Sequence, residues 1–123
     1  MSPAAHTTTH RAALDEDFLD RVFFALANRT RRQILDVLAQ APGCTVGDVA
    51  GRFDVSRIAI LKHLSALEEA GLVLSARNGR ERNLWLNAVP LQLVHERWSE
   101  QYRDFWAKRL SRLKYAAERE GER

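Results

Sequence analysis

The apolar residues of this chain recur every three or four positions through most of its length, which is the spacing of amphipathic helices. Polar residues suited to start a helix precede four of these stretches, and a proline opens the fifth. The pattern predicts five helices, which begin at or just after Asp15, Asn28 or Thr30, Thr45, Ser56 and Pro90. The third is expected to end at Arg52 or Phe53, and the last at about Glu118. The residues predicted to form the buried faces of the second and fourth helices are Ile34, Leu35, Leu38, Ile60, Leu64 and Leu67.

Between the fourth and the last predicted helix, the helical spacing gives way to a hairpin pattern. Residues 72–77 and 82–87 are predicted to be strands, and the Asn78-Gly79 pair between them strongly favours a tight turn. The order helix, turn, helix, hairpin is typical of a helix-turn-helix with a wing, which places its second helix in the major groove of DNA. The predicted fold class is therefore α+β and mainly helical, a winged helix-turn-helix. Its N- and C-terminal helices are predicted to be dimerisation helices, which contact a second copy of the chain.

The composition limits the classes of protein to consider. The 123 residues suit one domain, expected at residues 14–118 between a disordered arm at residues 1–13 and a tail at residues 119–123. A net charge of +3 permits nucleic-acid binding without establishing it. The single cysteine, Cys44, fits a reducing cytoplasm, and neither a secretory signal nor a stretch of about 20 apolar residues is found, so we expect a cytoplasmic protein without a membrane partner. The sequence lacks a phosphate-binding glycine loop and a serine nucleophile motif, and we therefore expect no enzyme.

The fourth predicted helix carries residues that can read base pairs. Arg57 is the preferred base reader, because its guanidinium matches the O6 and N7 acceptors of guanine. Lys62 could reach a phosphate or a base. Ile58 and Leu61 are apolar where a solvated helix favours polar groups. They could contact thymine methyls or pack on a neighbouring element, and the sequence leaves both open.

The predicted hairpin is cationic, with only Glu81 opposing its arginines. Such a tip suits phosphates or a narrow minor groove, although solvated hairpins are often charged as well. The predicted DNA-binding residues of helix and hairpin are Ser56, Arg57, Ile58, Leu61, Lys62, Ser65, Arg77, Arg80 and Arg82.

An apolar stripe runs along the last predicted helix. Such a stripe is more often core or a dimer seam than the wall of a ligand pocket. The predicted dimer interface consists of Phe18, Val22, Trp98, Tyr102, Phe105, Trp106, Leu110 and Leu113. The alternative is a winged-helix module that docks a protein partner through this aromatic helix.

Few residues suggest a metal or redox site. His6 and His10 have ligand spacing but no helical signal around them, and His95 has no second histidine on its helix. We expect no metal and no cofactor. Cys44 precedes a helix start, which favours a reactive thiolate, but a structural or incidental cysteine is the stronger expectation.

Several motifs together resemble the ArsR/SmtB family of winged-helix transcriptional repressors. They are LANRTRRQIL at residues 26–35, VSR at 55–57, KHL at 62–64, LEEAGLV at 67–73 and NGRER at 78–82. The resemblance covers about Phe18 to Leu113, and the aromatic run on the last helix is similar to a non-metal branch of the family.

The resemblance implies a homodimer that binds an inverted repeat near a promoter and represses transcription. Many members of the family release DNA when a metal or another signal binds. Metal sensors among them carry a cysteine pair at the third helix, or paired histidine and acidic ligands on the last helix. The chain has neither set, so a small-molecule effector is possible but unidentified.

Overall fold

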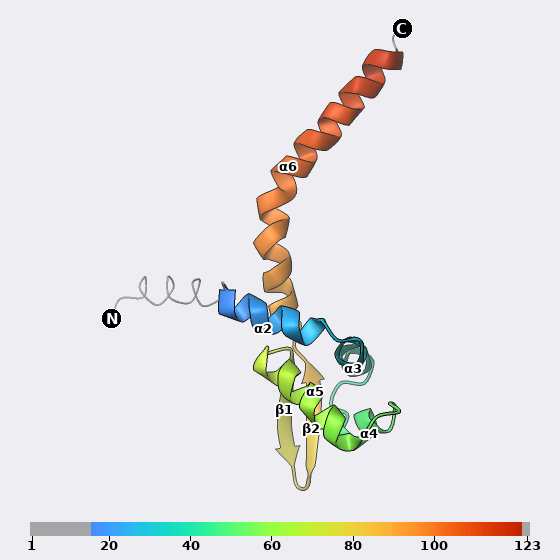
Figure 1. Cartoon of the computed structure of the whole chain (residues 1–123), viewed down its shortest axis with the longest axis vertical. Coiled ribbons are helices and arrows are strands. Elements are labelled where there is room, and N and C mark those ends of the chain that lie inside the picture. Colours follow the sequence, from blue (N-terminus) through green and yellow to red (C-terminus); the bar gives the residue numbers. More distant parts are fainter. Residues whose placement is uncertain (1–15, 122–123) are drawn as a thin grey trace, which may run out of the picture. The chain divides into compact units, whose positions relative to one another are not determined.

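The computed structural model describes residues 16–121 of the chain. The expected N-terminal arm and its two histidines, His6 and His10, lie outside these residues. The elements are α2 (Glu16–Leu26), α3 (Arg29–Gln40), α4 (Val46–Ala50), α5 (Arg57–Glu69), β1 (Val73–Asn78), β2 (Glu81–Leu86) and α6 (Val89–Gly121) (Figure 1). The predicted fold class is confirmed, because helices dominate and the only sheet among residues 16–121 is a two-stranded antiparallel hairpin.

Side chains at the helix starts account for where the helices begin. The Asn28 Oδ1 atom accepts a hydrogen bond from the backbone N–H of Arg31 at 3.1 Å, so Asn28 rather than Thr30 caps α3. Thr45 and Asp48 form a reciprocal capping box at the start of α4. The Ser56 hydroxyl accepts from the backbone N–H of Ala59 at the start of α5.

Two helix ends differ from the prediction. Helix α4 stops at Ala50 rather than at Arg52 or Phe53. The backbone N–H groups of Arg52 and Phe53 donate to carbonyls three residues back, which is the bond of a tight turn, and Gly51 is a poor helix former. Helix α6 runs on to Gly121, beyond the expected end.

The core lies where α2, α3 and α5 meet the base of the hairpin. The predicted faces of α3 and α5 are confirmed, since all six of their residues are buried. Val22 was predicted to lie in the dimer interface, but its side chain is 0% exposed and belongs to the core of the single chain. Its place in the apolar stripe of α2 is explained by packing inside the molecule, because α2 packs on α5 and α3.

The hairpin forms with a turn shifted by one residue from the Asn78-Gly79 prediction. Asn78 pairs with Glu81, which leaves Gly79 and Arg80 as the two-residue loop. Gly79 has a φ of +69°, whereas no other residue type among residues 16–121 has a positive φ, and this combination is that of a type II′ turn. The shift places Arg77 directly opposite Arg82 and Arg80 at the tip.

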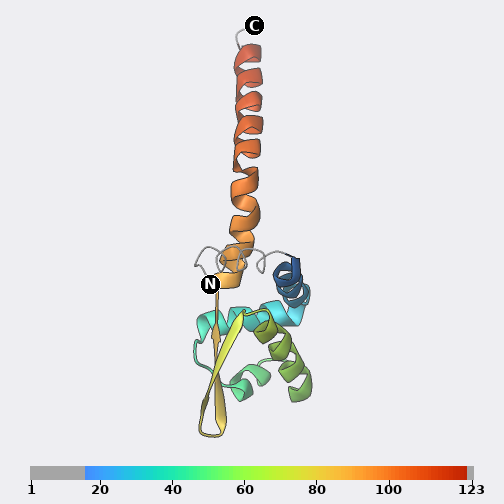
Figure 2. The same cartoon turned by 90° about the vertical axis from the view of Figure 1, so that its left-hand side faces the viewer.

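The free edge of β2 is tied to the segment that precedes α4. Gly43 and Cys44 exchange backbone hydrogen bonds with Leu84, and the Asn83 side-chain amide donates to the Gly43 carbonyl at 2.7 Å. Thr45 continues this pairing through an isolated bridge to Asn83. The hairpin is therefore fixed beside the start of α4, and the two views of the ribbon show it extending past the adjoining helices (Figures 1 and 2).

Residues 92–121 belong to a second unit of the chain, formed by most of α6. Among residues 16–121, no helix combines the length and the apolar content that crossing a bilayer requires.

Candidate nucleic-acid interface

Helix α5 presents one face to the core and the opposite face to solvent. Ile60, Leu64 and Leu67 are fully buried and anchor it. The predicted DNA-binding residues of α5 are all exposed, as is its cap: Ser56, Arg57, Ile58, Leu61, Lys62 and Ser65. The helix can therefore offer these side chains to a partner without any rearrangement of the core.

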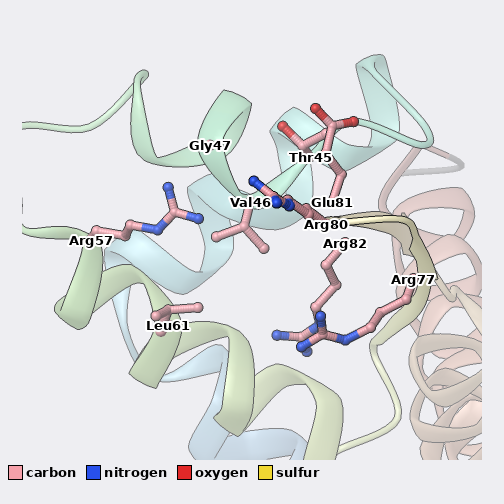
Figure 3. A pocket seen from close by; sticks show the side chains of 9 residues that line it. All are labelled: Thr45, Val46, Gly47, Arg57, Leu61, Arg77, Arg80, Glu81 and Arg82. Atoms are coloured by element: carbon pink, nitrogen blue, oxygen red, sulfur yellow. The ribbon is translucent and has the colours of Figure 1, made fainter.

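A groove of about 320 Å³ separates α5 from the hairpin. Its lining consists of Thr45, Val46, Gly47, Arg57, Leu61, Arg77, Arg80, Glu81 and Arg82. Arginines from α5 and from the hairpin face this space from two sides (Figure 3). Four guanidinium groups and one carboxylate thus border a single surface hollow, which is a concentrated site for anions.

The structure brings together some of the predicted residues and not others. Arg57 and Leu61 lie in the groove with the three hairpin arginines, whereas Ile58, Lys62 and Ser65 lie outside it on the exposed side of α5. The groove also contains the start of α4, whose residues are not among the predicted DNA-binding residues. The capping signal at Thr45 marked a helix start, but it gave no sign of what lay beside it.

Two arginines face each other across the strands of the hairpin. Arg77 and Arg82 occupy directly opposed positions, where like charges destabilise a sheet. Arg82 is partly compensated by an ion pair with Glu68 of α5, in which both side chains are half-buried. Among residues 16–121, no carboxylate lies within ion-pair distance of Arg57, Arg77 or Arg80. These three cations are available for an external anion, while Arg82 also joins the hairpin to α5.

Two arginines of α3 bind the carbonyl end of α2. Arg31 donates to the carbonyls of Ala25 at 2.8 Å and Phe24 at 2.6 Å, and its guanidinium lies over the Phe24 ring. Arg32 donates to the carbonyl of Leu26 at 2.6 Å. Cations at the C-terminus of a helix satisfy its last carbonyls and interact favourably with its dipole. This explains why arginines stand at these positions although neither lines the groove.

Arg31 also connects this cluster to α5 through His63. Its Nη1 atom lies 3.3 Å from His63 Nδ1, and because a guanidinium can only donate, the imidazole accepts through an unprotonated nitrogen. Burial lowers the pKa of His63, and the charge of Arg31 lowers it further. His63 therefore supports the position of α5 in its neutral form.

The free energy of unfolding is expected to fall as the pH drops from about 7 to 5, in part because of His63. A histidine in the unfolded chain titrates near pH 6.5, whereas the lowered pKa in the folded chain resists protonation. The contribution of His63 is thus present above about pH 6.5 and lost as the pH falls below it. Urea unfolding of His63→Gln at pH 7, 6 and 5 should show a shallower decline than the parent chain. His95→Gln, at an exposed position, is the matched control. An equal decline of the free energy of unfolding in both variants would contradict the role of His63.

Asp48 and Cys44 lie close to the start of α4. The backbone N–H of Thr45, followed by its hydroxyl, lowers the pKa of Asp48, so this carboxylate stays charged in its capping role. Burial, followed by the charge of Asp48, raises the pKa of the Cys44 thiol. A reactive thiolate needs the opposite shift, so the raised pKa favours a structural or incidental Cys44 over a reactive one.

The described residues contain no grouped metal ligands. Between residues 16 and 121, no three His, Cys, Asp or Glu side chains come together in a way that could hold a metal ion.

Helix α6 carries a row of exposed apolar side chains. Tyr102, Phe105, Trp106, Leu110 and Leu113 are all exposed, and the rings of Phe105 and Trp106 meet edge to face with centroids 5.7 Å apart. Phe18 and Trp98, also predicted for the dimer interface, are half-buried. Exposed apolar side chains that recur at helical spacing along one side of a helix are typical of an interaction site.

Comparisons with known proteins identify the fold that carries this groove. Residues 26–76 match the model of a helix-turn-helix domain family. The transcriptional repressor SdpR of Bacillus subtilis (strain 168) is 36% identical over 74 residues, which are 60% of this chain and 81% of the repressor. A solved ArsR-like transcriptional regulator from Rhodococcus sp. RHA1 is 38% identical with a TM-score of 0.66, over 83% of this chain and 92% of that chain. The chain belongs to the ArsR family of winged helix-turn-helix transcriptional regulators.

A further ArsR-related structure concerns assembly. The homodimeric winged helix-turn-helix DNA-binding domain Mb0332 from Mycobacterium bovis, described as a possible ArsR-family regulator, is 26% identical with a TM-score of 0.56. The alignment covers 84% of this chain and 90% of that chain.

As an ArsR-family regulator, the protein has α5 as its recognition helix and the β1–β2 hairpin as its wing, and the groove lies between the two.

Proposed function

We propose that this ArsR-family regulator is a cytoplasmic homodimer that binds an inverted-repeat operator in double-stranded DNA and represses transcription without catalysis. The observation that carries the proposal is the groove between α5 and the wing, which four arginines border. A recognition helix in the major groove would bring the wing onto the flanking backbone. The relative SdpR is a transcriptional repressor, and this supports repression rather than activation.

The apolar row on α6 supports the dimer. A second copy of the chain can cover it with an identical surface, as two-fold symmetry requires. The homodimeric state of the Mycobacterium bovis neighbour fits this assignment. Two copies would present two recognition helices, and an operator built of two half-sites follows from that symmetry.

Footprinting on promoter fragments from the source genome tests the proposal. The purified protein is expected to protect two inverted half-sites whose centres are about one helical turn of DNA apart, roughly 34 Å. Light scattering on the same sample should give the mass of two chains. Failure to prefer any fragment over random DNA, or protection of one isolated half-site by a monomer, would overturn it. Capture of a protein partner through α6, by a chain that stays monomeric, would favour the docking-module alternative.

Arg80→Ala is expected to weaken binding to every sequence by a similar factor. Arg80 lies at the tip of the wing with no protein carboxylate as partner among residues 16–121, so it is placed to contact a phosphate. Removing one phosphate contact should reduce the slope of log affinity against log salt by about one. Titrations from 50 to 200 mM salt, with operator and random duplexes, measure both quantities. Arg119→Ala removes the same charge in the last turn of α6 and should leave the slope unchanged; a slope lowered equally by both variants would contradict the contact.

A further inference from the structure

Two apolar side chains stand on the exposed surface of the recognition helix. Ile58 is 68% exposed and Leu61 is 40% exposed. They have not been drawn into the core, which Ile60, Leu64 and Leu67 fill from the opposite face. Ile58 therefore does not pack on a neighbouring element of the single chain, and Leu61 packs there only in part.

The surroundings of this pair are cationic. Ile58 and Leu61 are three residues apart and so are neighbours on one helix face. Arg57 precedes them and Lys62 follows, and Leu61 points into the groove that Arg57 and the wing arginines border (Figure 3). A second copy of this chain would bring like charges together here. Duplex DNA instead offers phosphates to the cations and, in the floor of the major groove, the methyl groups of thymine to the apolar atoms.

We propose that Ile58 and Leu61 read the 5-methyl groups of thymines close to the guanine that Arg57 reads; this rests on the proposed function. The rise of an α-helix, about 1.5 Å per residue, separates Arg57 from Leu61 by roughly 6 Å along the axis. Successive bases of a strand are about 3.4 Å apart. The half-site therefore contains thymine within about two or three base pairs of that guanine, and Ile58 and Leu61 determine this part of the specificity.

Replacement of thymine by deoxyuridine tests the proposal without changing the base pairing. The operator found by footprinting is synthesised with uracil at each thymine of one half-site in turn, and affinities are measured by fluorescence anisotropy. Loss of one contacted methyl should weaken binding by roughly threefold to fivefold, the effect of burying one methyl-sized group. Thymines outside the half-sites should give no change.

Variants of Ile58 assign the contact. At the thymine that Ile58 contacts, Ile58→Ala is expected to bind the thymine duplex and the uracil duplex equally. Ile58→Val keeps a branched apolar group and should retain the preference for thymine. Leu74→Ala shortens another exposed aliphatic side chain, on β1 and outside the groove, and should keep the full preference of the parent chain. Thermal unfolding of each variant confirms that it is folded.

The outcomes separate this proposal from the proposed function. Specific operator binding that is indifferent to uracil at every position, or a preference that Ile58→Ala and Leu61→Ala both retain, overturns the methyl contact and leaves the proposed function intact. Absence of specific binding to any duplex overturns both. A preference for thymine that disappears with Ile58→Ala or Leu61→Ala, and persists with Leu74→Ala, establishes the contact.

Discussion

The variant Trp106→Glu/Leu113→Glu is expected to be a monomer and to bind the operator at least roughly 100-fold more weakly than the parent chain. Both side chains are exposed on α6, by 56% and 62%, in the row that we assign to the second copy. Glutamates placed in the centre of an apolar interface would be desolvated without partners, and they would face their own copies across the two-fold axis. A monomer binds one half-site and loses the gain from linking two, typically a factor of 10² to 10⁴.

Tyr115→Glu provides the matched control for this variant. Tyr115 is 65% exposed on the same helix. It lies nine positions after Trp106, and at about 100° per residue this places the two on opposite sides of α6. Sedimentation velocity should show a dimer for Tyr115→Glu and a monomer for the double variant. A double variant that stays dimeric would place the seam elsewhere, and a monomer with the affinity of the parent chain would remove the need for a dimer.

The sequence predicted the parts of the fold that depend on neighbours along the chain. The spacing of Ile60, Leu64 and Leu67 requires only that a helix has 3.6 residues per turn, and all three are buried as expected. The caps at Thr45 and Ser56 involve residues three positions apart, and both form. The winged helix-turn-helix follows from the order of these local signals.

Where residues distant in the chain decide the structure, the sequence pattern predicts less. The pattern identified Val22 as apolar, but it could not say whether its own chain or a second chain covers it. The strands fixed the hairpin while the turn moved by one residue, because Asn-Gly and Gly-Arg loops both fit between them.

The groove shows this limit most clearly. Its arginines were each identified as DNA-binding candidates, yet their meeting with the start of α4 depends on the pairing of Thr45 with Asn83, 38 positions apart in the chain (83 − 45). The ion pair between Glu68 and Arg82 likewise joins α5 to β2, although the whole of β1 lies between these residues in the sequence. The period of the apolar residues predicts which face of a helix or strand is buried, but it does not predict how far one element lies from another.

Arg57→Ala is expected to lower the affinity for the operator by roughly 5-fold to 150-fold, with a much smaller effect on random DNA. The guanidinium stands in the first turn of the recognition helix and has no carboxylate partner among residues 16–121. A bidentate pair with guanine typically discriminates by about 1–3 kcal/mol, and its loss removes preference rather than general attraction. Because the side chain is exposed, the free energy of unfolding should change by no more than about 0.5 kcal/mol.

Arg57→Lys separates the charge of this residue from its shape. Lysine keeps the positive charge that phosphates attract, but it lacks the planar fork that fits both acceptors of guanine. Titrations with operator and random duplexes at one salt concentration should therefore show random-DNA binding close to that of the parent chain for Arg57→Lys, with specificity reduced nearly as far as in Arg57→Ala. If instead Arg57→Lys keeps full specificity while Arg57→Ala weakens both duplexes equally, Arg57 contacts the backbone. Base reading would then depend on Lys62 and on the apolar pair beside it.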